Sequence, residues 1–279
     1  MNPPTVPFLM YHAIRSVPGT YQVPGTSAAE VDPVYTVTLD EFEQQLAYLR
    51  RSGFHTVTLT EFLAWHRYGD PLPTNPIVLT FDDGDPSHFE LALPRLTQYG
   101  FRAVFAVVPS WIGTTRSFSI EQLHTLQTAG MEIISHGMHH IPLTDLELPQ
   151  LREELFASRT QLEVWLGKPI QALAIPRGYC SVRVRQIAYE AGYQVICTSR
   201  PDRNHRDSDP YNLGRIPIKA DMSPEEFADL VQAHPIQRAL QLAGYLIRTS
   251  FQRLLGPKRY DRLRGFLLRL SAQGATRHA

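Results

Sequence analysis

The chain has only two cysteines, Cys180 and Cys197, among its 279 residues. Two cysteines cannot form the network of bridges that holds small secreted domains together, so the fold must rest on a hydrophobic core. The length is ample for such a core. We expect both thiols to be free inside it, and the sequence alone leaves a bond between them as the alternative.

Long apolar stretches are also missing. No segment approaches the ~18 uninterrupted apolar residues that a membrane span requires. Residues 1–4 (Met-Asn-Pro-Pro) carry no charged leader followed by a long apolar segment. We therefore expect a cytoplasmic protein, although a chain whose leader had been removed would begin in the same way.

Net charge is absent overall, because 27 basic residues balance 27 acidic ones. The chain as a whole therefore has no global electrostatic attraction to nucleic acid. The balance hides an asymmetry: residues 236–279 hold nine basic and one acidic residue, a net charge of +8. Residues 1–235 carry the compensating −8. This difference predicts a main domain at 1–235 and a basic extension at 236–279.

Two carboxylates stand directly after an apolar, strand-like run at residues 77–81. Asp82 and Asp83 repel one another, and an apolar surrounding disfavours their ionisation. A divalent cation removes that cost. His136 and His140 follow a second strand-like run, at residues 131–134. One carboxylate oxygen with two imidazoles suits a catalytic zinc site that keeps an open position for water.

Strand-like and helix-like segments alternate from residue 7 to about 235. Seven or eight such units follow one another without an internal repeat, and several helices begin with capping-box patterns (Thr38/Glu41, Ser119/Gln122 and Ser223/Glu226). The pattern predicts an α/β fold with a parallel sheet, open or closed as a barrel. In a barrel the functional residues lie at the carboxyl ends of the strands. His12, both aspartates, both histidines and the Pro176-Arg177-Gly178 turn fall at such ends.

These residues resemble a known family. Thr80-Phe81-Asp82-Asp83-Gly84, with His136-x-x-x-His140, is similar to the motifs of the polysaccharide deacetylases, the NodB homology or carbohydrate esterase family 4 group. The resemblance covers roughly residues 5–235. It implies a distorted (β/α) barrel of about seven strand–helix units. It also implies zinc or another divalent cation, and hydrolysis of an N-acetyl group on an amino sugar.

The resemblance also implies roles by position. Asp82 would be the general base, and Asp83, His136 and His140 the metal ligands. The backbone N–H of Arg177 would stabilise the oxyanion, and its side chain could orient the base or contact an anionic substrate, since Ala174 stands where the family often has an orienting arginine.

The late Leu-x-His motif of the family is absent, because the expected strand reads Leu213-Gly214-Arg215-Ile216-Pro217-Ile218. The general acid is therefore open. His12, which follows the first strand, is our main candidate, and His205 is a weaker one. Trp111, after another strand, is a candidate for stacking on a sugar, with packing as its alternative.

The basic extension has an apolar stripe at helical spacing, at Leu240, Ala243, Ile247, Phe251 and Leu254, with arginines between. Three interpretations stay open: docking on the acidic main domain, peripheral binding to an anionic membrane at its inner face, or binding of a partner. A cytoplasmic location would favour a lipid-linked or nucleotide-linked sugar, as in cell-surface polysaccharide synthesis. The alternatives are a deformylase or another small-amide hydrolase, and a glycan-binding protein without catalysis.

Overall fold

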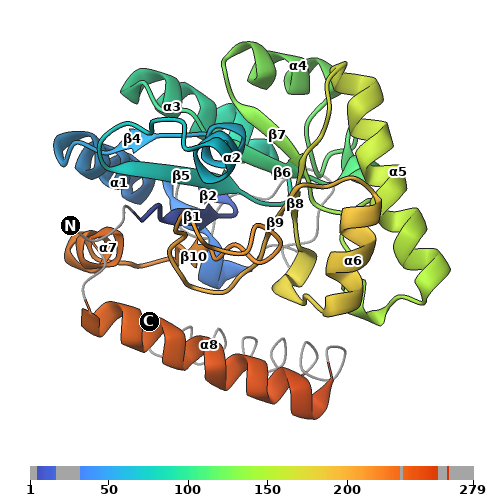
Figure 1. The fold of residues 1–279 in the computed structure, drawn as a ribbon. Coiled ribbons are helices and arrows are strands. Elements are labelled where there is room, and N and C mark those ends of the chain that lie inside the picture. Colours follow the sequence, from blue (N-terminus) through green and yellow to red (C-terminus); the bar gives the residue numbers. More distant parts are fainter. Residues whose placement is uncertain (1–4, 17–31, 233–234, 257–262, 264–279) are drawn as a thin grey trace, which may run out of the picture.

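The computed structural model describes residues 5–16, 32–232, 235–256 and 263. Its centre is a parallel sheet curled into a distorted barrel, with helices packed around the outside (Figure 1). The strands follow the order β10–β1–β5–β6–β7–β8–β9, and β4 also pairs with β5. Their bounds are β1 (Phe8–Tyr11), β4 (His55–Thr56), β5 (Pro76–Phe81), β6 (Val104–Val107), β7 (Glu132–Ser135), β8 (Ala172–Ala174), β9 (Val195–Cys197) and β10 (Ile216–Pro217).

One segment links the two ends of this strand order. The amide of Leu213 donates to the Ile196 carbonyl at 3.0 Å, and the amide of Thr198 donates to the Leu213 carbonyl at 2.8 Å. Three residues later, Ile216 pairs with Leu9 of β1 in parallel register. Residues 213–217 thus contact the first and the last strand of the curl, and the prediction of a distorted (β/α) barrel is confirmed.

The helices follow the strands as the alternation predicted. Their bounds are α1 (Leu39–Arg51), α2 (Leu59–Tyr68), α3 (Leu93–Tyr99), α4 (Ile120–Thr128), α5 (Leu148–Leu166), α6 (Val182–Glu190), α7 (Pro224–Val231) and α8 (Pro235–Leu255). All three predicted capping boxes form, at α1, α4 and α7, and another forms at α2. The short elements are β2 (Ile14–Arg15), β3 (Val37–Thr38), and the turns η1 (Pro33–Tyr35), η2 (His88–Ala92), η3 (Pro109–Trp111), η4 (Leu143–Asp145) and η5 (Pro176–Gly178).

The segment that leads into α3 is not a regular α-helix. Residues 88–92 form a wide π-type turn, η2, before α3 begins, and the amide of Leu93 bonds to the carbonyl of His88. Pro94 explains the wide turn, because proline has no N–H to donate to the carbonyl four residues earlier. The extra width carries His88 into the core, where it is fully buried.

Alternation along the strands divides the core into two layers. Leu9, Leu79 and Ile133 belong to the layer between sheet and helices, whereas Phe8, Val78 and Ile134 fill the barrel interior. Both cysteines are free thiols, as expected, with Cys197 buried in the interior layer. Among the described helices, none is long and apolar enough to cross a membrane.

Candidate active site

Side chains two residues apart on a strand point to the same side of the sheet, so the strands that fill the barrel interior with apolar side chains also direct polar side chains into it. Val78 and Ile134 point inward, so Thr80 and Asp82 continue one inward row and His136 continues another. By the same rule Phe8 is followed inward by Met10 and His12, and Leu213 by Arg215. The strands are parallel, so the last member of each row lies at the same end of the barrel. The polar side chains that end these four rows therefore lie together: Asp82, His136, His12 and Arg215.

Asp83, His136 and His140 form the cluster predicted to bind a metal. The Oδ1 atom of Asp83 lies 3.1 Å from His140 Nε2 and 3.4 Å from His136 Nε2. One possible ligand atom from each residue lies within 4.8 Å of the others. The structure places the three predicted ligands around one point.

The chemistry of this cluster fits a divalent cation. Asp83 Oδ1 is buried and has no hydrogen-bond partner among the described residues, which is costly for a carboxylate. His136 Nδ1 lies 2.9 Å from the Ala174 carbonyl, which can only accept, so Nδ1 carries the proton and Nε2 offers its lone pair to the cluster. Asp83 and His140 also have positive φ angles of 75° and 56°. Such backbone strain is concentrated at functional sites.

The ionisation of these groups follows from burial and from their neighbours. Burial raises the pKa of Asp83, but the positive charges of His140 and His136 hold that pKa well below its usual range. Burial lowers the pKa of His136, yet the carboxylates of Asp82 and Asp83 raise it above the ordinary value. For His140 burial prevails and the pKa is lowered. The negative charge of the two aspartates is thus the dominant feature that a cation would meet.

Asp82 is held by an arginine to which our sequence analysis assigned no role. Arg215 donates from Nη1 to Asp82 Oδ1 at 2.5 Å and from Nη2 to Oδ2 at 2.8 Å. The guanidinium also donates to Thr198 O and Thr80 Oγ1, and it is fully buried. Burial raises the pKa of Asp82, but the charges of Arg215 and His136 keep it below its ordinary value. Asp82 is therefore an oriented, ionised carboxylate beside the cluster, with Oδ2 3.9 Å from His136 Nε2.

Arg215 fills the orienting position that we looked for at 174 and 177. The family motif predicts a histidine on the strand that is formed by β10 and the residues before it. The side chain that points inward from this strand is Arg215. One signal was present in the sequence: an arginine between Leu213 and Ile216 in a short apolar strand needs a buried carboxylate as its partner. The spacing of residues along the chain could not identify which carboxylate pairs with this arginine.

His12 lies at the edge of the same site. Its ring stacks on Tyr35 with centroids 5.1 Å apart, and its charge contributes to lowering the pKa of Asp82. The carbonyl of His12 is bonded to Nε2 of the buried His88, which fixes the backbone of this residue. Its buried Nδ1 has no hydrogen-bond partner within the described ranges.

The turn after β8 borders the cluster from another side. Arg177 is exposed, has a φ of 60°, and its charge contributes to the lowered pKa of His140. The ring of Pro176 lies against Gly137, where an added Cβ would be 3.3 Å from Cγ of the proline. The prediction that the Arg177 N–H stabilises an oxyanion stays a prediction.

The remaining candidates are placed as follows. The ring of Trp111 lies 5.2 Å from that of His140, with the Arg116 guanidinium 3.9 Å above its centre. His205 is remote, because its neighbour Asn204 pairs with Val6, before the start of β1 and so at the opposite end of that strand from His12. His139 is no part of the cluster: its Nδ1 bonds to the buried Glu154 at 2.8 Å.

The part of the chain that carries most of this site is similar to a known protein family. The sequence profile of the family described as polysaccharide deacetylase matches residues 69–196, which include Asp82, Asp83, His136, His140 and Arg177. His12 and Arg215 lie outside the matched range.

Some individual relatives are similar to this chain over a longer range than the family profile. A Bacillus subtilis (strain 168) protein named for the same family, YxkH, is 26% identical over 232 residues, which are 83% of this chain and 78% of that protein. The poly-beta-1,6-N-acetyl-D-glucosamine N-deacetylase of Escherichia coli (strain K12) is 38% identical over 79 residues, only 28% of this chain and 12% of that enzyme. Among solved structures, the Streptococcus pyogenes deacetylase PplD has the same fold, with a TM-score of 0.73 at 24% identity, over 82% of this chain and 99% of that one.

Proposed function

Because the chain belongs to the polysaccharide deacetylase family, we propose that it removes the N-acetyl group from N-acetylglucosamine units of a glycan. The observation that carries this proposal is an ionised, arginine-held Asp82 directly beside the Asp83, His136 and His140 cluster. The relative from E. coli, which acts on a β-1,6-linked polymer of this sugar, supports the choice of substrate class.

Asp83, His136 and His140 would hold the cation, and zinc is our first choice because mixed nitrogen and oxygen ligands suit it. A bound divalent cation supplies a Lewis acid that polarises an amide carbonyl and acidifies water. Asp82 is the base that accepts the proton of the attacking water. Arg215 keeps that carboxylate ionised in a buried place and fixes the direction in which it faces.

Acetate release from a panel of acylated substrates tests the reaction. The panel contains β-1,4- and β-1,6-linked N-acetylglucosamine oligomers, and N-formyl and other small amides as the alternative substrates. The wild type should release acetate from the oligomers, and Asp82→Asn should be slower by about 10²-fold or more. The matched control is Asp145→Asn, at an exposed aspartate of η4, which should keep full activity. Preference for formyl or other amides would favour the alternative hydrolase.

We propose His12 as the acid that protonates the leaving nitrogen. It is the histidine that ends the inward row of β1, and its charge reaches Asp82. An amide needs this proton, because an amine is a poor leaving group without it, whereas an activated phenyl acetate does not. His12→Ala should therefore lose about 10²-fold on the oligomers and little on the phenyl ester. Equal losses on both substrates would contradict the assignment, and Asp82→Asn, which should lose activity on both, is the control.

The outward face of α8 supports a second proposal, peripheral membrane binding. Ile236, Ile247, Phe251 and Leu254 lie on that face and are 52% to 82% exposed. The helix contains three arginines and no acidic residue. Exposed apolar side chains beside positive charge are what an anionic bilayer surface binds.

Sedimentation with phosphatidylcholine vesicles, with or without phosphatidylglycerol, tests this proposal. The wild type should bind the anionic vesicles in a salt-sensitive way, and the double variant Ile247→Ser/Phe251→Ser should not. Leu246→Ser, at a leucine of α8 that is 53% exposed and does not belong to this set of residues, is the control of equal chemistry. Binding that is unchanged in the double variant would show that this face has another role. The part of the extension after residue 256 lies outside the described residues except for Leu263.

A further inference from the structure

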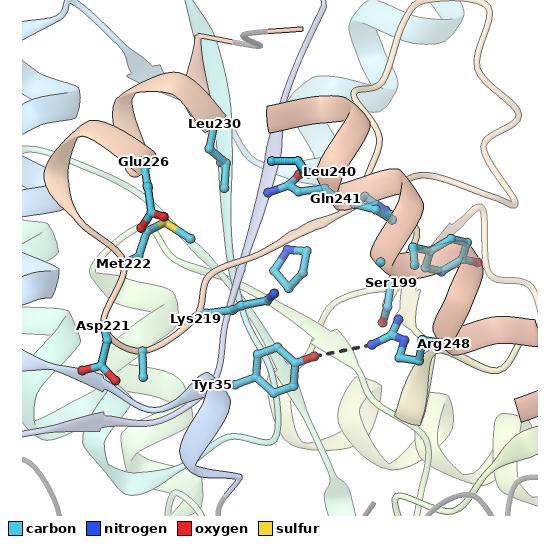
Figure 2. Close-up of a pocket in the computed structure, with 15 residues that line it drawn as sticks. Tyr35, Ser199, Lys219, Asp221, Met222, Glu226, Leu230, Leu240, Gln241 and Arg248 are labelled. Carbon is cyan, nitrogen blue, oxygen red and sulfur yellow. Dashed lines mark hydrogen bonds between the residues drawn. The ribbon is translucent and has the colours of Figure 1, made fainter. Parts of the chain in front are cut away.

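A cavity of about 460 Å³ lies between α8 and the end of the barrel that carries the site. Figure 2 shows its walls, with Tyr35, Lys219 and Ser199 on the barrel side and Leu240, Gln241 and Arg248 on the helix. Its barrel-side residues come mainly from the loops after β2, β9 and β10, and two of them, Glu226 and Leu230, come from α7. The volume falls in the range of about 300–1,000 Å³ that is usual for small-molecule sites.

Two contacts join this cavity to the active site. Tyr35, in its wall, stacks on the ring of His12. Ser199, also in its wall, packs against the turn after β8, where a Cβ added to Gly178 would lie 2.6 Å from the serine oxygen. A chain-like substrate whose reacting unit lies between His12 and that turn would therefore extend directly into the cavity.

The chemistry of the walls indicates an uncharged, hydroxyl-rich ligand. Two tyrosines, Tyr35 and Tyr245, offer aromatic rings, and Gln241 and Ser199 offer donors and acceptors. The charged wall residues balance, since Lys219 and Arg248 are matched by Asp221 and Glu226. A cavity with no net charge does not select a phosphate or another anion. Aromatic rings with scattered polar groups are suited to a sugar ring.

We propose that this cavity binds a sugar unit adjacent to the one that is deacetylated, and that α8 is a wall of this subsite. The inference rests on the proposed glycan substrate. It gives the C-terminal helix a place in substrate selection: Tyr245 supplies its ring from α8, and Arg248 is positioned by its hydrogen bond to Tyr35 Oη at 3.4 Å.

The test measures dependence on oligomer length in the full-length protein. Binding of N-acetylglucosamine and of its β-1,4- and β-1,6-linked oligomers is followed by calorimetry, and deacetylation is followed as KM and kcat. In the wild type, longer oligomers should bind more tightly than the monomer. Tyr245→Ala should weaken oligomer binding by about fivefold to tenfold, the usual value of one aromatic contact, with monomer kinetics unchanged. Arg248→Ala should act in the same direction.

Leu246→Ala is the matched control, because this residue neighbours Tyr245 on α8 and is not part of the cavity wall. It should retain the wild-type dependence on length. If Tyr245→Ala and Leu246→Ala behave alike, or if the wild type binds monomer and oligomer equally, the subsite is refuted. If no substrate is deacetylated but binding still depends on length and on Tyr245, the subsite stands and the proposed reaction fails.

Discussion

The contact between Asp82 and Arg215 makes a strong thermodynamic prediction. Both residues are at most 2% exposed, and two hydrogen bonds join their side chains. Removing one member of a buried pair leaves an uncompensated charge and costs about 3–5 kcal/mol of unfolding free energy. We expect this loss for Arg215→Met and for Asp82→Leu alone. Replacing both members with apolar residues removes both charges, so the double variant should recover most of the loss.

A double-mutant cycle by urea unfolding measures this coupling, which we expect to be at least about 3 kcal/mol. The control is the ion pair between Arg185 and Asp209, which has an N–O distance of 3.1 Å and is 33% and 50% exposed. Its cycle, with Arg185→Met and Asp209→Leu, should give less than about 1 kcal/mol. Additive losses in the Asp82 and Arg215 cycle would refute the buried pair.

The cost of Arg215→Met should also depend on pH. The folded pKa of Asp82 is lowered, so its ionisation stabilises the wild type above the unfolded pKa of about 4, and this contribution is lost as the pH falls through the folded pKa. In the variant, burial without the guanidinium raises that pKa, and the carboxyl takes up a proton in mild acid. The stability difference between variant and wild type should therefore shrink from pH 7 to pH 5. A constant difference would contradict the argument.

Further predictions concern the metal, a thiol and a glycine. Elemental analysis should find one divalent ion per chain, which is lost in His140→Ala and kept in His139→Ala; equal content in both would remove the proposed site. Burial raises the pKa of Cys197 to about 12, so its thiol should resist iodoacetamide at pH 8 until urea unfolds the protein, and rapid labelling of the native form would contradict this. Gly137→Ala should cost about 1–3 kcal/mol in urea unfolding, because φ is 74° and the new Cβ would lie 3.1 Å from Glu154 Oε1. Gly113→Ala, with a φ of 79° and open space around it, should cost less, and equal losses would show that the close contacts do not matter.

The order of strands and helices, and most of the proposed metal cluster, could be read from local sequence. Residues that share a strand face are two apart, so Val78, Thr80 and Asp82 point the same way in any sheet. Parallel strands then bring the ends of such rows to one edge. The proximity of Asp83 and His136 could therefore be predicted from this rule, without knowledge of any other long-range contact. The capping boxes also formed as predicted, because their partners are only three residues apart.

The partner of Asp82 was decided by the tertiary structure. Arg215 lies 133 residues further along the chain, and only the curl of the sheet brings the segment 213–217 across to the base. The orientation of α8 was likewise undecided by its sequence. Its apolar stripe allowed packing on the main domain, yet the structure turns Gln241, Tyr245 and Arg248 toward the cavity and leaves Ile247, Phe251 and Leu254 exposed. Periodicity shows that a helix has two faces, but which face packs inward depends on the surface that it meets.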